Sequence, residues 1–358
     1  MTAPQPRPIL SELPRYVPGA RGTDEAAPPI KLSSNETPLG PLAGIVESIA
    51  SAGAAVNRYP DMSNTALAHA LAESRGVAVE KLALGAGSVA VLGHILQAFC
   101  DAGEPVVYAW RSFEAYPIIA RIAGADIREV PLAGGGRHDL HAMALAAQDA
   151  RVVFLCSPNN PTGPAIEAEE FEAFMLAVPR STLVVLDEAY AEFVRAPDAV
   201  DGLDFLDRHP NLVVTRTFSK AYGLAGLRVG YAIAAPEIAA AIRACVTPFS
   251  VSSVAHDAAL ASLAAEAALL ARVEEIVAER SRVVAALGLD GWAVPNPQGN
   301  FVWISAGSEA VGLAAHMRDG TPAIVVRPFP GDGVRITLGS KEENDAMLAA
   351  LAQYPQRF

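Results

Sequence analysis

Short runs of apolar and β-branched residues recur along the first part of the chain, and stretches with helical periodicity lie between them. Near-continuous apolar runs bounded by polar loops are typical of strands buried on both faces of a parallel sheet. The runs that predict strands are 81–87, 104–110, 151–157, 182–188 and 211–217. The stretches that predict helices are 41–53, 65–75, 88–100 and 112–124. This alternation predicts an α/β domain with a mostly parallel central sheet flanked by helices, over about residues 41–240.

The pattern changes after residue 245, where strands and helices no longer alternate strictly. An Ala-, Leu-, Glu- and Arg-rich stretch predicts one long helix over roughly 252–287. Strands are expected at 301–305, 323–329 and 333–339, and a closing helix at 341–354. We therefore expect a smaller α+β domain at 245–358, which an N-terminal arm, residues 1–40, joins through a short strand and loop at 30–40.

Composition narrows the classes of function. The chain has 358 residues, a length that fits two domains, and a formal net charge of −12. An acidic surface disfavours nucleic acid and anionic membranes as partners. There is no apolar run of transmembrane length, and the proline-rich N-terminus lacks the apolar core of a signal peptide, so we expect a cytoplasmic protein. Cys100, Cys156 and Cys245 lack CxxC spacing and predict neither a disulfide framework nor a metal site.

Polar groups follow three of the predicted strands. These groups are the loop 157–163 (SPNNPTG), the segment 187–190 (DEAY), and Lys220 with Arg228 after the third strand. Taken singly, each group has an ordinary explanation. The loop 157–163 can be a tight turn, Asp187 and Glu188 can be a helix cap or a pair of metal ligands, and Lys220 can be a solvated surface residue. Because ligands bind at the carboxyl ends of the strands in open α/β sheets, all three loops are expected to meet in one crevice.

This set of groups suits a pyridine aldehyde phosphate. A lysine amine forms an imine with the aldehyde, and a carboxylate keeps the pyridine nitrogen protonated, so that the ring can accept carbanion electrons. An amide and a phenol can hydrogen-bond the phenolic oxygen of the ring. Hydroxyls, backbone N–H groups and an arginine suit the phosphate.

The segments SPNNPTG, DEAY and TFSKAYGLAGLRVGY (217–231) resemble the motifs of fold-type I pyridoxal-phosphate-dependent aminotransferases. The most similar subgroup comprises histidinol-phosphate and aromatic amino acid aminotransferases. The likeness runs from RYVPG (15–19) to GVRITLGSKEEND (333–345), and RSFEAYP (111–117) is most similar to the aromatic, phenylalanine branch.

The resemblance implies a role for individual residues. Lys220 is the expected Schiff-base lysine and the acid/base for the proton shift, and Asp187 the partner of the pyridinium nitrogen. Asn160 and Tyr190 are expected to hydrogen-bond the phenolic oxygen of the ring, with Tyr190 counted among the catalytic residues. Arg335 is expected to bind the substrate α-carboxylate, because a guanidinium fits a carboxylate in a bidentate geometry.

The remaining implied roles concern the phosphate, the ring face and the partner subunit. The residues expected around the phosphate are Ser88, Val89, Thr217, Ser219 and Arg228. Phe113 is expected to stack on the pyridine ring, where histidinol-phosphate enzymes often carry Tyr. Tyr59 is expected to reach the phosphate of a neighbouring subunit, which implies a homodimer.

Residues 85–90 (GAGSVA) also match a dinucleotide-binding pattern, G-x-G-x-x-A. The acidic residue that such a site needs after the next strand is missing, because that strand ends in Ala109, Trp110 and Arg111. The loop is therefore interpreted as a cradle for one phosphate.

The resemblance leaves the substrate open. In histidinol-phosphate enzymes the substrate phosphate is expected near the counterparts of Tyr16, Asn35 and Arg327. Against that activity, Pro328-Phe329 follow Arg327, and Phe113 and Trp110 are expected to add apolar surface. We predict transfer between an aromatic L-amino acid (phenylalanine, tyrosine or tryptophan) and 2-oxoglutarate.

Other activities remain as alternatives. They are the histidinol-phosphate reaction of histidine biosynthesis or dual activity, and lyase, decarboxylase or synthase chemistry on the same fold. A cofactor-binding regulatory protein is disfavoured, because the segment before residue 40 has no room for a DNA-binding domain.

Overall fold

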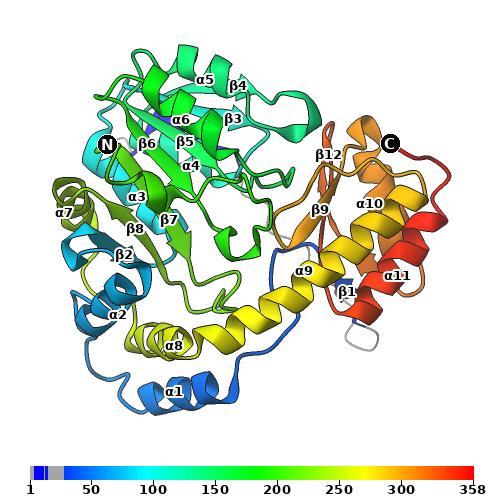
Figure 1. The fold of residues 1–358 in the computed structure, drawn as a ribbon, viewed down its shortest axis with the longest axis horizontal. Helices are drawn as coiled ribbons and strands as arrows, with labels where there is room; N and C mark the ends of the chain where they lie inside the picture. Colours follow the sequence, from blue (N-terminus) through cyan, green and yellow to red (C-terminus); the bar gives the residue numbers. More distant parts are fainter. Residues whose placement is uncertain (1–3, 12, 15–27) are drawn as a thin grey trace.

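The computed structural model describes residues 4–11, 13–14 and 28–358. A seven-stranded sheet with the order β2-β8-β7-β6-β5-β3-β4 forms its centre (Figure 1). The strands are β2 (Leu82–Gly85), β3 (Pro105–Trp110), β4 (Asp126–Pro131), β5 (Val152–Cys156), β6 (Leu183–Asp187), β7 (Leu212–Thr217) and β8 (Gly230–Ala234). β8 runs antiparallel to both of its neighbours, and the other pairs are parallel. The expected mostly parallel sheet is confirmed.

Helices cover both faces of this sheet, which explains why its strands other than the edge strand β4 are largely apolar. The helices are α1 (Ala43–Gly53), α2 (Thr65–Arg75), α3 (Ser88–Phe99), α4 (Ala115–Ala123), α5 (Leu140–Ala146), α6 (Ala168–Ala177) and α7 (Pro236–Cys245). α3, α4 and α7 pack on the face that carries Val106 and Tyr108. α2, α5 and α6 pack on the face that carries Val107 and Ala109.

The long helix expected at 252–287 was a wrong prediction, because two helices occupy this stretch. They are α8 (Ser253–Ala264) and α9 (Glu266–Leu289), and they meet at an angle of 81°. α8 packs its alanines into the core of the large sheet, whereas α9 from Val273 onward belongs to a second core. We therefore propose that the two expected domains meet at this bend, later than residue 245. By length and composition, no single helix in the described residues could cross a membrane.

The second core surrounds a three-stranded antiparallel sheet of β9 (Phe301–Ile304), β12 (Gly333–Thr337) and β11 (Arg327–Phe329). α10 (Ala310–Asp319) and α11 (Lys341–Ala352) pack beside it, and Figure 1 shows α9 crossing toward it from the large sheet. The strand expected at 323–329 divides in two. Its first half, β10 (Ile324–Val325), pairs in parallel with β1 (Ile30–Lys31) of the arm, and its second half is β11.

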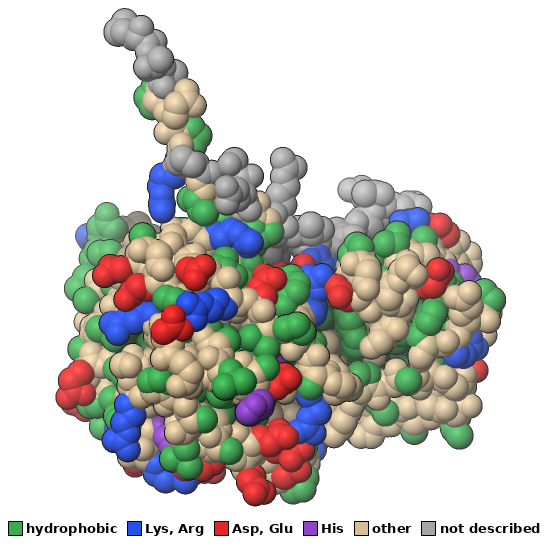
Figure 2. All heavy atoms as spheres, turned by 90° about the horizontal axis from the view of Figure 1, so that it is seen from above, with side chains coloured by type: hydrophobic (Ala, Val, Ile, Leu, Met, Phe, Trp, Pro, Cys, Tyr) green, Lys and Arg blue, Asp and Glu red, His purple; other side chains and the backbone are tan. Residues whose placement is uncertain are grey.

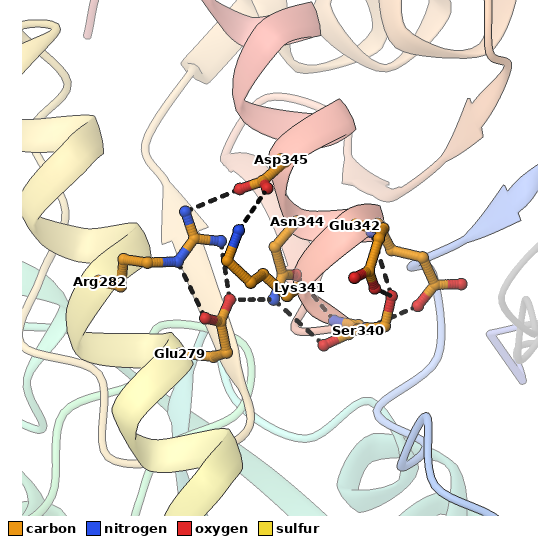
Figure 3. A network of polar contacts seen from close by, with 9 residues as sticks. Glu279, Arg282, Ser340, Lys341, Glu342, Asn344 and Asp345 are labelled. Carbon is orange, nitrogen blue, oxygen red and sulfur yellow. Dashed lines mark hydrogen bonds and ion pairs between the residues drawn. The ribbon is translucent and has the colours of Figure 1, made fainter.

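A polar network ties the start of α11 to α9 (Figure 3). Ser340 and Glu343 form a capping box, in which the Ser340 hydroxyl accepts from the Glu343 N–H at 3.2 Å and the Glu343 carboxylate accepts from the Ser340 N–H at 2.7 Å. Asn344 donates to Glu279 at 3.1 Å, and Arg282 pairs with Glu279. The cap satisfies N–H groups that the first helical turn leaves without partners.

Charged side chains of both signs lie interspersed over the face shown in Figure 2. Ion pairs occur at the surface of the molecule, as between Arg137 and both Glu167 and Glu170. The net charge of −12 is therefore not gathered into one acidic region on this face.

Candidate active site

A cavity of about 220 Å³ lies where β5, β6 and β7 end, between the large sheet and the small one. Its walls come from these strand ends, the start of α3, the loop after β1, and strands β11 and β12. Thirteen of the residues expected in the site line it: Asn35, Ser88, Val89, Phe113, Asn160, Asp187, Tyr190, Thr217, Ser219, Lys220, Arg228, Arg327 and Arg335. The loops after the three strands therefore meet in one crevice, as the topology predicts.

Lys220 follows β7 by three residues and extends its amine into the cavity. Its Nζ donates to the backbone carbonyl of Asn35 at 3.1 Å. Burial, with the positive charges of Arg335 and Arg228, lowers the pKa of this amine to about 8. The neutral, nucleophilic form of the amine is therefore a minor fraction near physiological pH, but a much larger one than for an ordinary lysine.

Asp187 ends β6 and is only 2% exposed. Its carboxylate accepts hydrogen bonds from the Tyr116 hydroxyl at 2.9 Å and from the Thr215 hydroxyl at 3.0 Å. Burial raises the pKa of Asp187 to about 6, and the two hydrogen bonds and the charge of Lys220 oppose this shift. At neutral pH the site therefore holds a buried carboxylate that a cationic group would stabilise.

Tyr116 and Thr215 were not expected in the site. Thr215 stands two residues before Thr217 on β7 and pairs in register with Asp187 on β6, so strand periodicity could have indicated it. Tyr116 lies on helix α4, and no pattern in the sequence indicates its contact with Asp187.

A chain of hydrogen bonds links the two sheets across the cavity. Arg335 on β12 donates to the amide oxygen of Asn160 at 2.6 Å and to the carbonyl of Ser33 at 3.0 Å. Asn35 donates to the Tyr190 hydroxyl at 2.7 Å and accepts from Thr337 at 3.0 Å. Burial raises the pKa of Tyr190, so its hydroxyl stays protonated and able to donate.

The opposite end of the cavity has the features of an anion site. α3 begins at Ser88, and Gly87 before it has φ +86° and no side-chain cap, so N–H groups of the first turn are available. Arg228 lies there with φ +62° and donates to the Ser219 hydroxyl at 3.2 Å. A methyl group on Gly87 would overlap the Arg228 guanidinium, and one on Gly230 would overlap the Ser88 N–H. The two glycines keep this cradle open.

Phe113 and Phe329 provide the aromatic wall of the cavity. Phe113 stands just before α4 and packs its ring edge-on against Tyr116, with 5.5 Å between the ring centroids. Trp110 was expected to add apolar surface, but it is not among the lining residues. Its ring packs against Tyr108 and lies 4.3 Å from the Arg111 guanidinium.

Further lining residues went unrecognised in the sequence. They are Ser33, Ser34, Ser112, Glu114, Cys156, Ala189 and Ala225. Ser33, Ser34 and Glu114 neighbour residues that were singled out, so proximity in the chain could have indicated them. Cys156 is buried, and burial raises the pKa of its thiol to about 12.

Of the two other expected site residues, the structure describes only Tyr59, and it does not line the cavity. Tyr59 is 83% exposed and stacks on Phe249, with 4.7 Å between the ring centroids. Tyr16 lies outside the described residues. Within those residues, no group of three or more His, Cys, Asp or Glu side chains is placed to hold a metal ion.

Comparison with known protein families identifies the class of enzyme to which this fold and this cavity belong. The family Aminotransferase class I and II matches residues 27–351, so the chain belongs to that family. Among its relatives is an aromatic amino acid aminotransferase of Streptomyces avermitilis, 50% identical over 99% of this chain and 98% of the relative. An aromatic amino acid aminotransferase of Rhodococcus opacus is 50% identical over 97% of this chain and 95% of its own length.

A solved structure with the same fold is histidinol-phosphate aminotransferase from Sinorhizobium meliloti in complex with pyridoxal 5'-phosphate. It is 32% identical, covers 90% of this chain and 89% of its own, and superposes with a TM-score of 0.84. The names of these relatives correspond to the two substrates that the sequence leaves open, an aromatic amino acid and histidinol phosphate.

Proposed function

We propose that the protein binds pyridoxal 5'-phosphate and transfers an amino group between an aromatic L-amino acid (phenylalanine, tyrosine or tryptophan) and 2-oxoglutarate. The observation that carries this proposal is the meeting of Lys220, Asp187 and Arg335 in one cavity. The relatives at 50% identity that bear the name aromatic amino acid aminotransferase support the substrate class.

The cavity fits the cofactor at three points. The buried Asp187 would meet the pyridinium nitrogen, and Asn160 and Tyr190 the phenolic oxygen. The cradle kept open by the glycines would take the phosphate; its residues would be Ser88, Val89, Thr217, Ser219 and Arg228. Phe113 would stack on the ring. When bound, the cofactor supplies an electron sink for a carbanion at the substrate α-carbon.

The side chains of this protein would supply binding and proton transfer. Arg335 would hold the α-carboxylate and so orient the amino acid. The Lys220 amine, with its pKa of about 8, would take the proton from the α-carbon and hold it for return. Tyr190 would keep its proton and donate it as a hydrogen bond.

An uncharged aromatic side chain suits the rest of the cavity. Phe113 and Phe329 offer apolar surface, which contributes roughly 25 cal/mol per Å² buried. Asn35 donates one N–H to the Tyr190 hydroxyl and accepts from Thr337, so these two bonds fix the orientation of its amide. Histidinol phosphate remains the second candidate donor, because the Sinorhizobium meliloti enzyme shares the fold at 32% identity.

The test is a comparison of kcat/KM for phenylalanine and histidinol phosphate, each with 2-oxoglutarate, on the protein loaded with pyridoxal 5'-phosphate. We expect a large preference for phenylalanine, and Lys220→Ala is expected to abolish turnover of both donors. A preference for histidinol phosphate would contradict the aromatic substrate and support histidinol-phosphate transamination, the second candidate function. Appreciable turnover by Lys220→Ala would remove this residue from the chemistry.

We also propose a homodimer in which Tyr59 contributes to the site of the partner subunit. Its exposure and its stacking on the half-exposed Phe249 support this role. Mixing Tyr59→Ala protein with Lys220→Ala protein tests it, because a hybrid dimer would contain one site with both residues intact. Recovery of activity on mixing is expected, and its absence would contradict a role across the interface. A cytoplasmic location stays a prediction, which the three free cysteines support.

A further inference from the structure

The substrate cavity holds two arginines on adjacent strands of the small sheet. Arg327 on β11 lies directly opposite Arg335 on β12 in the register of the antiparallel pair. Both guanidiniums lie near the Phe329 ring, at 5.5 and 5.9 Å from its centroid. Side chains opposite each other share one face of a sheet, where two like charges are unfavourable unless one is neutralised.

Arg327 has its counter-ion inside the cavity. Its Nη2 lies 2.7 Å from Oε2 of Glu114, and both residues are lining residues. The Arg327 side chain is 8% exposed and that of Glu114 29% exposed, so the pair lies where water screens it weakly. Because Arg327 lies opposite Arg335, the residue expected to bind the substrate α-carboxylate, the ion pair with Glu114 stands beside the expected substrate site.

We propose that Glu114 is a specificity-determining residue, whose carboxylate competes with any anionic group of a substrate side chain for Arg327. The inference rests on the proposed function and extends it. An uncharged aromatic ring leaves the ion pair intact. A phosphate or a second carboxylate has to displace Glu114 from Arg327 and then lie close to the displaced negative charge.

The same competition applies to the acceptor. 2-Oxoglutarate carries a second carboxylate, so it meets the carboxylate of Glu114 just as a phosphorylated donor does. Removing the charge of Glu114 is therefore expected to strengthen the binding of both anionic side chains.

The test uses Glu114→Gln and a matched control, Glu167→Gln. Both glutamates stand at the N-cap of a helix without a side-chain capping bond, and both pair with an arginine, Glu167 with Arg137 at 2.8 Å. Only Glu114 lines the cavity. The ratio of kcat/KM for histidinol phosphate to that for phenylalanine is expected to rise by about tenfold in Glu114→Gln and to stay unchanged in Glu167→Gln.

Binding of two unreactive acids gives a second readout. Glutarate carries a side-chain carboxylate and 3-phenylpropionate a side-chain ring, and calorimetry measures the Kd of each. Glu114→Gln is expected to lower the Kd of glutarate by about tenfold relative to that of 3-phenylpropionate. Glu114→Asp keeps the charge but withdraws it by one methylene, and is expected to give a smaller change in the same direction; it serves as the test if the glutamine variant does not fold.

The outcomes separate this inference from the proposed function. Turnover of phenylalanine by a Glu114→Gln protein whose two ratios equal those of the unchanged protein would overturn the role of Glu114 alone. An equal change in Glu167→Gln would overturn it as well. An unchanged protein that turns over neither donor would count against the proposed function, and the two binding constants would still decide whether Glu114 competes for Arg327.

Discussion

The guanidinium of Arg335 lies 2.6 Å from the amide oxygen of Asn160, and this hydrogen bond joins β12 of the small sheet to the loop after β5 of the large one. The arginine expected to bind the substrate and the asparagine expected to bind the cofactor therefore position each other. A change in either residue is expected to disturb both binding steps.

Arg335→Lys keeps the positive charge but loses the planar fork that fits a carboxylate. We expect kcat/KM for phenylalanine to fall on the order of 100-fold, mainly through KM. Steady-state kinetics measures this, with Arg318→Lys as the control, because Arg318 is 62% exposed and pairs with Asp319 at the surface. An unchanged KM would place the carboxylate elsewhere.

The stability of the cofactor-free protein is expected to depend on Asp187. Its folded-state pKa is raised from 3.8 to about 6, so its favourable contribution is present below pH 3.8 and is lost as pH rises through about 6. Asp187→Asn removes the buried charge. The variant should match the unchanged protein near pH 4 and exceed it by up to about 3 kcal/mol at pH 8. Denaturant unfolding at both pH values measures this, and parallel pH profiles would contradict it.

Gly230 in the phosphate cradle and Gly93 outside it are expected to respond differently to substitution by alanine. A methyl group at Gly230 would overlap the backbone of Gly87 and Ser88, so Gly230→Ala is expected to weaken binding of pyridoxal 5'-phosphate by at least about tenfold. Gly93 lies inside α3 with open space around it, and Gly93→Ala should raise stability by roughly 1 kcal/mol without changing cofactor affinity. Absorbance titration gives the affinities. Equal affinities in the two variants would remove Gly230 from the cradle.

The capping box of α11 predicts a local stability effect. Ser340→Ala removes the acceptor for the Glu343 N–H and should cost about 1 kcal/mol of unfolding free energy. Ser308→Ala, at an exposed position in the same part of the chain, should change it by less than about 0.5 kcal/mol. Denaturant unfolding compares the two, and a loss of equal size would argue against the cap as the cause.

Much of the fold follows from patterns within the chain. Helix α2 begins and ends at the predicted residues Thr65 and Arg75, because apolar periodicity and the following Gly76 mark it clearly. The bend between α8 and α9 could not be predicted. Ala265, where the helix breaks, is a strong helix former, and the break follows from α8 packing on the large core while α9 packs on the other.

Some residues of the candidate site could likewise be predicted from the sequence, and others could not. Motifs after the strands indicated the residues around Lys220 and Asp187, because strand ends converge in any sheet of this topology. Contacts between residues that lie far apart in the sequence correspond to no pattern within it. The hydrogen bond from Tyr116 to Asp187 and the ion pair of Glu114 with Arg327 depend on how α4 lies against both sheets.

The pairing of β1 with β10 also sets an order of events during synthesis. Ile30 and Lys31 leave the ribosome early, but their partners Ile324 and Val325 come from near the end of the chain. Domains generally fold from the N-terminus as they emerge, so the large sheet can assemble first. Ser33 and Asn35, which follow β1 and line the cavity, are held through that pairing. The substrate cavity is therefore completed only after Ile324 and Val325 have been translated.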